Sequence, residues 1–186
     1  MAMHVANRLG VFVLLSALLA GCGSQTSTGG DFAVPYRNPT APLGVTSRYA
    51  DTGFAGKWHV RGAFPLDATL RTVERRAAGL DAPVWVLTHR KCVDGGACVD
   101  MAKIWNVEAD VAGADTLMDP TGGPDRRAVV VWVDDAFRTA AVAGADGRFA
   151  WVLDRFPRGG TDRIAAARQV LEFSGFDLTD MQMRPK

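Results

Sequence analysis

Two cysteines and a histidine that lie close together are the residues best suited to chemistry. Cys92 and Cys98 flank a short stretch that contains Gly95 and Gly96, and His89 precedes Cys92 by three positions. Nearby thiols form a disulfide in an oxidising compartment, or they bind a metal as thiolates. The set lacks a fourth convincing ligand and the spacing of a zinc knuckle. The disulfide is therefore the favoured prediction, and no metal is expected.

Catalytic motifs are missing from the rest of the sequence. His59 and His89 are the histidines outside the N-terminal segment, and neither sits in a nucleophile elbow or a metalloprotease motif. No spacing of carboxylates points to a catalytic pair. We therefore expect a protein that is not an enzyme and has no cofactor. Turnover of an ester or lipid that depends on His89 is kept as a third hypothesis.

The charge of the chain argues against nucleic-acid binding. The 186 residues include 21 Lys and Arg against 20 Asp and Glu, which gives a formal net charge of +1, and the basic residues do not cluster. Nucleic-acid-binding domains instead carry a basic patch or stripe. A chain of this length is expected to form one folded domain.

A hairpin with Cys92 opposite Cys98 would fix the pairing of the two strands that flank it. The loop at residues 94–96 offers glycine at the left-handed position of a three-residue turn. Arg90 then faces Asp100 on the cysteine side. The other side carries three further pairs: Trp85 with Trp105, Leu87 with Lys103, and His89 with Met101. Each pair contributes roughly 0.2–1 kcal/mol, and a shift of one residue would exchange the two faces.

Alternation with period 2 predicts β-strands across residues 56–156. One face of the first strand is predicted to point away from solvent, and it is made of Trp58, Val60, Gly62 and Phe64. Residues 99–111 form a long strand with apolar side chains on one parity, and residues 128–133 are continuously apolar. Residues 70–78 are interpreted as a strand with outward charges, although they also fit a short basic helix.

One amphipathic helix is predicted near the C-terminus, over residues 161–174. Thr161 suits the N-cap position and Gly175 suits the position just after the helix. An apolar stripe runs along the helix: Ile164, Ala167, Val170 and Leu171. The predicted fold class is all-β with one C-terminal α-helix.

Two segments far apart in the chain resemble the strands that close the barrel of one protein family. Residues 56–58 read Gly-Lys-Trp, and residues 149–155 end in Leu-Asp-Arg. Their order and content resemble the lipocalins, and more narrowly the bacterial outer-membrane lipocalins. The resemblance implies that Gly56, Trp58 and Arg155 close the barrel floor. A guanidinium stacked on an indole is worth about 0.5–2 kcal/mol.

The resemblance implies an eight-stranded antiparallel up-and-down β-barrel with the helix packed outside. Such a barrel is just wide enough to be filled by side chains or to hold one small ligand. The hairpin register places six side chains inside as a predicted ligand-binding wall: Trp85, Leu87, His89, Met101, Lys103 and Trp105. This set suits an amphiphile whose anionic head meets Lys103, although Lys103 also fits a solvated position at the rim.

The N-terminus is predicted to be a lipoprotein signal peptide. An apolar run after Arg8 ends in Leu-Ala-Gly-Cys, which resembles the lipobox of bacterial lipoproteins. The resemblance implies cleavage before Cys22 and its acylation, although an ordinary signal peptide with a chance Cys also fits. The predicted domains are residues 1–21 as signal peptide, 22–54 as lipidated Cys and flexible tether, and 55–186 as barrel domain. Part of the tether can instead pack along the barrel as an N-terminal arm.

Two main function hypotheses follow. The first is a membrane-anchored lipocalin that reversibly binds or transports a small hydrophobic or amphipathic ligand, such as a fatty acid or lysophospholipid. We expect it at the bacterial outer membrane, facing the periplasm, because Gly23 replaces the Asp associated with inner-membrane retention. The second is a filled barrel that acts as a structural or protein-interaction lipoprotein, for instance an inhibitor. Neither hypothesis fixes the oligomeric state.

Overall fold

The structure is a computed structural model that describes residues 35–76 and 83–184. The predicted signal peptide, Cys22 and the tether up to residue 34 lie outside the described residues. The predicted strand at residues 70–78 is described up to Arg76, where it is a strand, so the helix alternative is wrong. The prediction that its charges face outward is wrong for Arg75, which is buried and pairs with Asp115.

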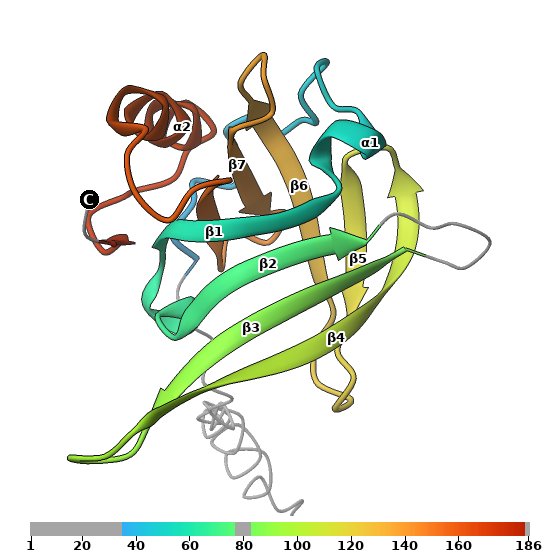
Figure 1. Cartoon of the computed structure of the whole chain (residues 1–186). Coiled ribbons are helices and arrows are strands. Elements are labelled where there is room, and N and C mark those ends of the chain that lie inside the picture. The colour runs from blue at the N-terminus through green and yellow to red at the C-terminus, as the bar shows by residue number, and fades with distance from the viewer. Residues whose placement is uncertain (1–34, 77–82, 185–186) are drawn as a thin grey trace, which may run out of the picture. The chain divides into compact units, whose positions relative to one another are not determined.

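Eight antiparallel strands follow one another around a closed barrel (Figure 1). The first strand pairs with both the second and the eighth, which closes the ring. The strands are β1 Gly56–Ala63, β2 Leu70–Arg76, β3 Val84–Cys92, β4 Cys98–Val111, β5 Ala114–Met118, β6 Arg126–Val133, β7 Thr139–Gly144 and β8 Ala150–Asp154. A two-residue strand, β9 (Gln182–Met183), adds to β1 on the outside of the ring. A one-turn 3-10 helix, η1 (Pro65–Asp67), lies between β1 and β2.

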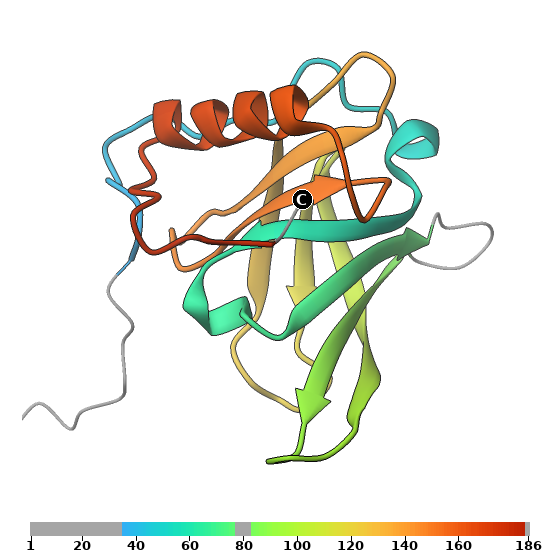
Figure 2. The same cartoon turned by 60° about the vertical axis from the view of Figure 1, so that its left-hand side comes forward.

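The predicted C-terminal helix is present as α2 (Thr161–Phe173), which packs across the outside of β6, β7 and β8 (Figure 2). It buries Ile164, Ala167 and Leu171. Gly175 follows the helix with φ +90°, which suits a residue without a Cβ. The predicted cap is wrong: Gly160 occupies the N-cap position, and no side chain caps the helix.

Residues 35–54, where the sequence predicted a flexible tether, pack along the barrel as an N-terminal arm. Tyr36 donates its backbone N–H to Gly147, and Thr46 donates to Val130, both at 2.9 Å. The arm ends in the short helix α1 (Asp51–Phe54), which covers the end of the barrel opposite the β3–β4 hairpin tip (Figure 1). For residues 35–54, the alternative prediction of an N-terminal arm packed along the barrel therefore agrees with the structure better than a flexible tether.

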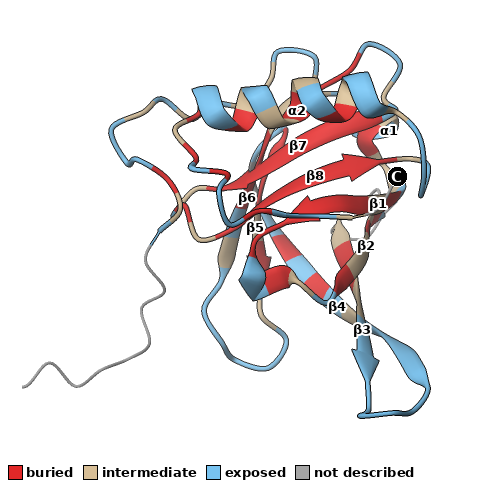
Figure 3. Cartoon of the chain, turned by 90° about the vertical axis from the view of Figure 1, so that its left-hand side faces the viewer, coloured by how far each residue is buried: buried red, intermediate tan, exposed pale blue. Residues whose placement is uncertain are grey.

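Side chains pack in two layers, one inside the barrel and one between the barrel and α2. Figure 3 shows that β7 and β8, which lie under α2, are buried along their length. In β1, Trp58, Val60 and Ala63 face the interior, whereas Phe64 joins the outer layer. The register between β1 and β8 shifts after Val60, and a bulge reverses the facing of the residues that follow it. The prediction that Gly62 and Phe64 share the face of Trp58 is therefore wrong.

Candidate functional site

The closed end of the barrel is held together by Arg155. Its guanidinium carbon lies 3.6 Å from the centre of the Trp58 ring. The same guanidinium donates hydrogen bonds to four backbone carbonyls: Gly53 (2.7 Å), Ala55 (2.8 Å), Lys57 (3.0 Å) and Phe137 (3.2 Å). Gly56 has φ +89° and passes directly beneath Arg155. Burial lowers the pKa of Arg155 from its usual value. The structure thus brings Gly56, Trp58 and Arg155 together where the sequence placed them.

Aromatic side chains fill the lower half of the barrel above this closure. Phe54, Trp58 and Trp85 are fully buried there, and Trp151 and Phe149, which are equally buried, continue the stack toward the open end. Trp85 and Trp151 lie 6.1 Å apart between ring centres, and Phe149 and Trp151 lie 4.8 Å apart. Rings at these separations attract one another beyond the area they bury. This packed layer leaves no room for a ligand near the floor.

A buried ionic network stabilises the same layer. Asp115 accepts hydrogen bonds from Arg75 Nε (2.8 Å) and from Trp85 Nε1 (2.7 Å). Arg75 also pairs with Asp51 of α1 at 2.9 Å. Buried charges are tolerated when they are paired and hydrogen-bonded. The indole N–H of Trp85, which the sequence assigned to the ligand wall, is therefore bonded to protein and lies in the floor.

Above the aromatic layer, the barrel mouth contains a cavity of about 370 Å³. Four of the six predicted wall residues line it: Leu87, His89, Lys103 and Trp105. Its other apolar lining comes from Leu66, Pro124 and Phe149. The volume falls within the roughly 300–1,000 Å³ that is typical of small-molecule sites, but eight of the thirteen lining residues are ionisable, so the cavity is more polar than most such sites.

Two ion pairs cross the mouth above the apolar walls. Lys103 Nζ lies 3.4 Å from Asp119 and 5.3 Å from the centre of the Trp105 ring. Arg126 pairs with Asp67 at 3.0 Å, and its guanidinium carbon lies 4.8 Å from the centre of the Phe149 ring. The cations thus sit over the aromatic walls at the rim, with their charges balanced by carboxylates.

His89 lies in the wall of the cavity, with its Nδ1 3.1 Å from the hydroxyl of Thr69. Burial lowers the pKa of His89 below its usual value, and Arg126 and Lys103 add to this effect, whereas Asp67 opposes it. A buried imidazole next to two cations favours the neutral form. His89 is therefore a neutral hydrogen-bonding group that becomes easier to protonate when an anion enters the mouth.

The β3–β4 hairpin has the predicted register over its whole length. Cys92 pairs with Cys98, Arg90 with Asp100, His89 with Met101, Leu87 with Lys103, and Trp85 with Trp105. A disulfide joins Cys92 and Cys98. Sulfur atoms bonded to one another are not thiolates, so the metal alternative fails at this hairpin. Within residues 35–76 and 83–184, no group of three or more His, Cys, Asp or Glu side chains is arranged to hold a metal ion.

Met101 does not line the cavity, although it has the inward parity. The hairpin tip extends past the neighbouring strands and is exposed there (Figures 2 and 3). Met101 is 51% exposed and Val99, the next inward-facing residue along β4, is 57% exposed. The placement of Met101 inside the barrel is therefore wrong, because alternation gives the face of a strand but not the height at which the barrel ends.

Sequence reasoning missed nine of the thirteen residues that line the mouth, among them Asp67, Asp119, Arg126 and Phe149. The first three come from the connections at the open end or from the start of a strand, where no periodicity marks them. Phe149 had a usable signal, because it shares the parity of Trp151 and Leu153 just before β8.

Comparisons with known proteins bear on the fold. No protein-family model matches the chain, and no curated protein matches it. The solved structure of lobster apocrustacyanin A1, a lipocalin, superposes with a TM-score of 0.53 and 11% sequence identity, over 73% of this chain and 78% of that chain. The chain has the lipocalin fold. At this identity the likeness shows only the lipocalin fold, which agrees with the closed eight-stranded barrel and the external α2.

In the described part of the chain, no helix combines the length and the apolar character that crossing a membrane requires.

Proposed function

We propose that the protein reversibly binds a small amphipathic ligand in the mouth of its lipocalin barrel, without turning it over. The observation that carries the proposal is the cavity of about 370 Å³ above a filled aromatic floor. A barrel filled throughout would favour the structural or inhibitor hypothesis. Here the filling stops below Leu87 and Trp105, and the space above them is bounded by apolar walls and a charged rim.

The walls and the rim define the chemistry of the ligand. Leu87, Trp105 and Phe149 offer apolar contacts inside the cavity. The rim offers the cations Lys103 and Arg126, each paired with a carboxylate, and further carboxylates at Asp125 and Asp146; His89 adds an imidazole to the wall. A ligand with an apolar tail and an anionic or zwitterionic head satisfies both parts, and a fatty acid or a lysophospholipid has this composition.

The hairpin tip supports a ligand that extends beyond the cavity. Along the inward face of β3 and β4, Leu87 and His89 line the cavity, and Met101 and Val99 continue the same face above the rim. These two apolar side chains are about half exposed. The part of an acyl chain too long for the cavity would cover them.

The proposal includes a lipid anchor at Cys22 and a place at the bacterial outer membrane, facing the periplasm. It rests on the apolar N-terminal run and the Leu-Ala-Gly-Cys sequence. Two or more acyl chains give stable anchoring, whereas a single chain gives only reversible binding. Mass spectrometry of protein purified from the membrane fraction should give an N-terminus at Cys22 carrying acyl mass. An unmodified N-terminus elsewhere would contradict the anchor.

Titration with a fluorescent fatty acid tests the binding proposal. Lys103→Gln should weaken binding about tenfold, because a charge-assisted contact contributes about 1.5–3 kcal/mol when fully formed and Lys103 is partly solvated. Leu87→Trp should abolish binding by filling the cavity. Lys57→Gln is the matched control, because Lys57 is exposed at the closed end. Absence of saturable binding to the unaltered protein would favour the structural or interaction function instead.

A further inference from the structure

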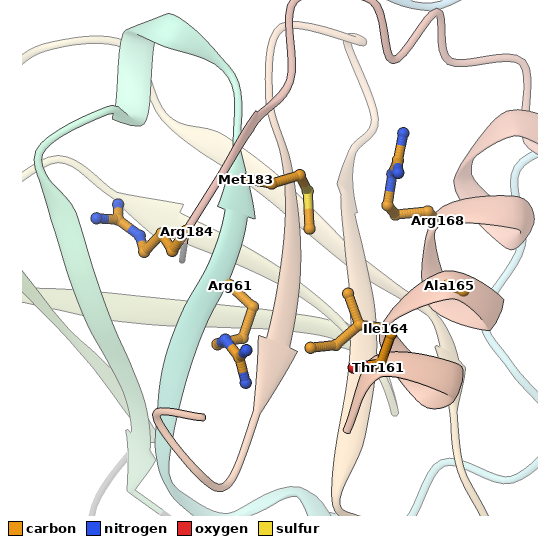
Figure 4. A pocket seen from close by; sticks show the side chains of 7 residues that line it. All are labelled: Arg61, Thr161, Ile164, Ala165, Arg168, Met183 and Arg184. Atoms are coloured by element: carbon orange, nitrogen blue, oxygen red, sulfur yellow. The ribbon is translucent and has the colours of Figure 1, made fainter. Parts of the chain in front are cut away.

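A second cavity lies outside the barrel, in the groove between β1, α2 and the C-terminal segment that contains β9 (Figure 4). Its volume is about 200 Å³. Ile164 and Ala165 of α2 and Met183 of β9 provide apolar side chains, and Arg61 of β1 and Arg168 of α2 provide cations. The groove is separate from the barrel mouth, since the two cavities share no lining residue.

Unpartnered donors concentrate around this groove. Among the described residues, four buried side-chain nitrogen or oxygen atoms have no hydrogen-bond partner, and three of them are the Nε atoms of Arg61, Arg168 and Arg184. All three arginines line the groove. Buried polar atoms are nearly always bonded, and an exception calls for a missing water or ion. Two of these atoms, Nε of Arg61 and Nε of Arg168, belong to side chains that face the groove from its two ends.

The arginines of this groove also differ from other arginines of the structure in lacking carboxylates. Arg75, Arg126 and Arg163 each pair with an Asp. Arg61 is 3% exposed, and its hydrogen bonds go to the backbone carbonyls of Phe156 and Gly159. Arg168 has no hydrogen bond or ion pair to any described residue. Carbonyls alone also hold the buried guanidinium of Arg37, but there Nε donates to Ser174, whereas Nε of Arg61 has no acceptor.

The side chains divide the groove into polar ends and an apolar middle. In Figure 4, Arg61 extends toward Thr161 at the start of α2, and Arg168 lies at the other end, with Met183 and Ile164 between them. Arg184 points away across β1, where it donates to the carbonyls of Ala68 and Leu70, so it adds positive charge but no direct contact.

The first turn of α2 adds to the positive character at the Arg61 end. Because Gly160 is the N-cap and no side chain caps the helix, backbone N–H groups at Thr161 are open to an acceptor. The nearby Asp154 is occupied by Thr139 and Arg163. An oxoanion at this end would meet the Arg61 guanidinium, the Thr161 hydroxyl and the helix N-terminus together.

We propose that this groove binds a small molecule that carries a carboxylate or phosphate group, with a short apolar chain laid on Ile164 and Met183. The anionic group sits at the Arg61 and Thr161 end, and Arg168 contributes at the other end. The volume of about 200 Å³ is below the range of drug-sized pockets, so the ligand has few heavy atoms. This site is additional to the ligand in the barrel mouth and does not depend on it.

Chemical-shift titration of the purified protein tests the proposal with three probes: hexanoate, hexanol and inorganic phosphate. Saturable shifts of the backbone amides at residues 161–168 and 181–184 are expected with hexanoate. Saturation by phosphate as well would identify the oxoanion as the recognised part, and saturation by hexanoate alone would show that the apolar chain is required. Both outcomes support the site.

Variants complete the test. Arg61→Gln should weaken hexanoate binding about tenfold, which corresponds to about 1.4 kcal/mol, because it removes the guanidinium at the carboxylate end, whereas Arg168→Gln, at the other end, should weaken it less. Arg61→Lys retains the positive charge but loses the paired N–H donors of the guanidinium, and it should weaken binding by a similar factor. Arg158→Gln, at an exposed arginine outside the groove, should leave binding unchanged. Equal binding of hexanol, no shift with any probe, or shifts confined to the barrel mouth would overturn the proposal.

Discussion

Replacement of Arg155 by Met keeps most of the apolar stem and removes the guanidinium that closes the barrel. The guanidinium donates to four backbone carbonyls from α1, β1 and the β6–β7 turn, and it covers the Trp58 ring at 3.6 Å. Loss of the cation–π contact costs about 0.5–2 kcal/mol. Each carbonyl left without its donor costs about 1–3 kcal/mol when fully buried, and less where water reaches it. We expect the free energy of unfolding to fall by about 3–5 kcal/mol.

Urea unfolding followed by tryptophan fluorescence measures this loss. Arg138→Met is the matched control, because Arg138 is half exposed and pairs with Asp134 four positions away. A partly exposed pair of this kind contributes less than about 1 kcal/mol. The denaturant slope should be the same in both variants, so that the midpoints compare stability directly. If Arg155→Met shifts the midpoint no more than Arg138→Met, the closure argument is wrong.

Three further predictions concern the mouth and the hairpin. Because folding lowers the pKa of both His89 and His59, the unfolded chain binds more protons near pH 6.5, so stability should fall as pH drops below that value; His89→Gln should reduce the slope of the urea-midpoint profile without removing it. Changing Cys92 and Cys98 to Ser should lower the free energy of unfolding by about 2 kcal/mol, since the loop they close is short; an unchanged urea midpoint would contradict this. Asp67→Asn should lower the free energy of unfolding by about 3 kcal/mol, because it leaves Arg126 without its buried carboxylate partner. A calorimetric loss below about 1 kcal/mol would show that this ion pair does not stabilise the barrel.

Local rules predicted the hairpin well, and the resemblance to the lipocalins predicted the barrel closure. The spacing of Cys92 and Cys98 fixed one register, and charge and indole pairing supported the same register, so several independent preferences agreed on β3 and β4. The Trp58 and Arg155 contact followed from the end-to-end closure of an antiparallel barrel. Agreement between local and long-range preferences is what makes a segment predictable.

The remaining features depend on where the chain bends and where the barrel ends. The bulge after Val60 adds one residue without changing the apolar pattern of β1, so Ala63 and Phe64 exchange faces. Met101 keeps its inward parity but lies above the rim. Asp67 and Asp119 reach the mouth from connections whose path is set by packing against the finished barrel. A sequence pattern carries none of this three-dimensional information.

A crystal structure of the protein with a saturating fatty acid that carries bromine at the end of its chain would locate the ligand directly. We expect an anomalous bromine peak in the barrel mouth, among Leu87, Trp105 and Phe149, with the carboxylate near Lys103 or Arg126. A barrel mouth without ligand at saturation, or bromine bound only outside the barrel, would contradict it.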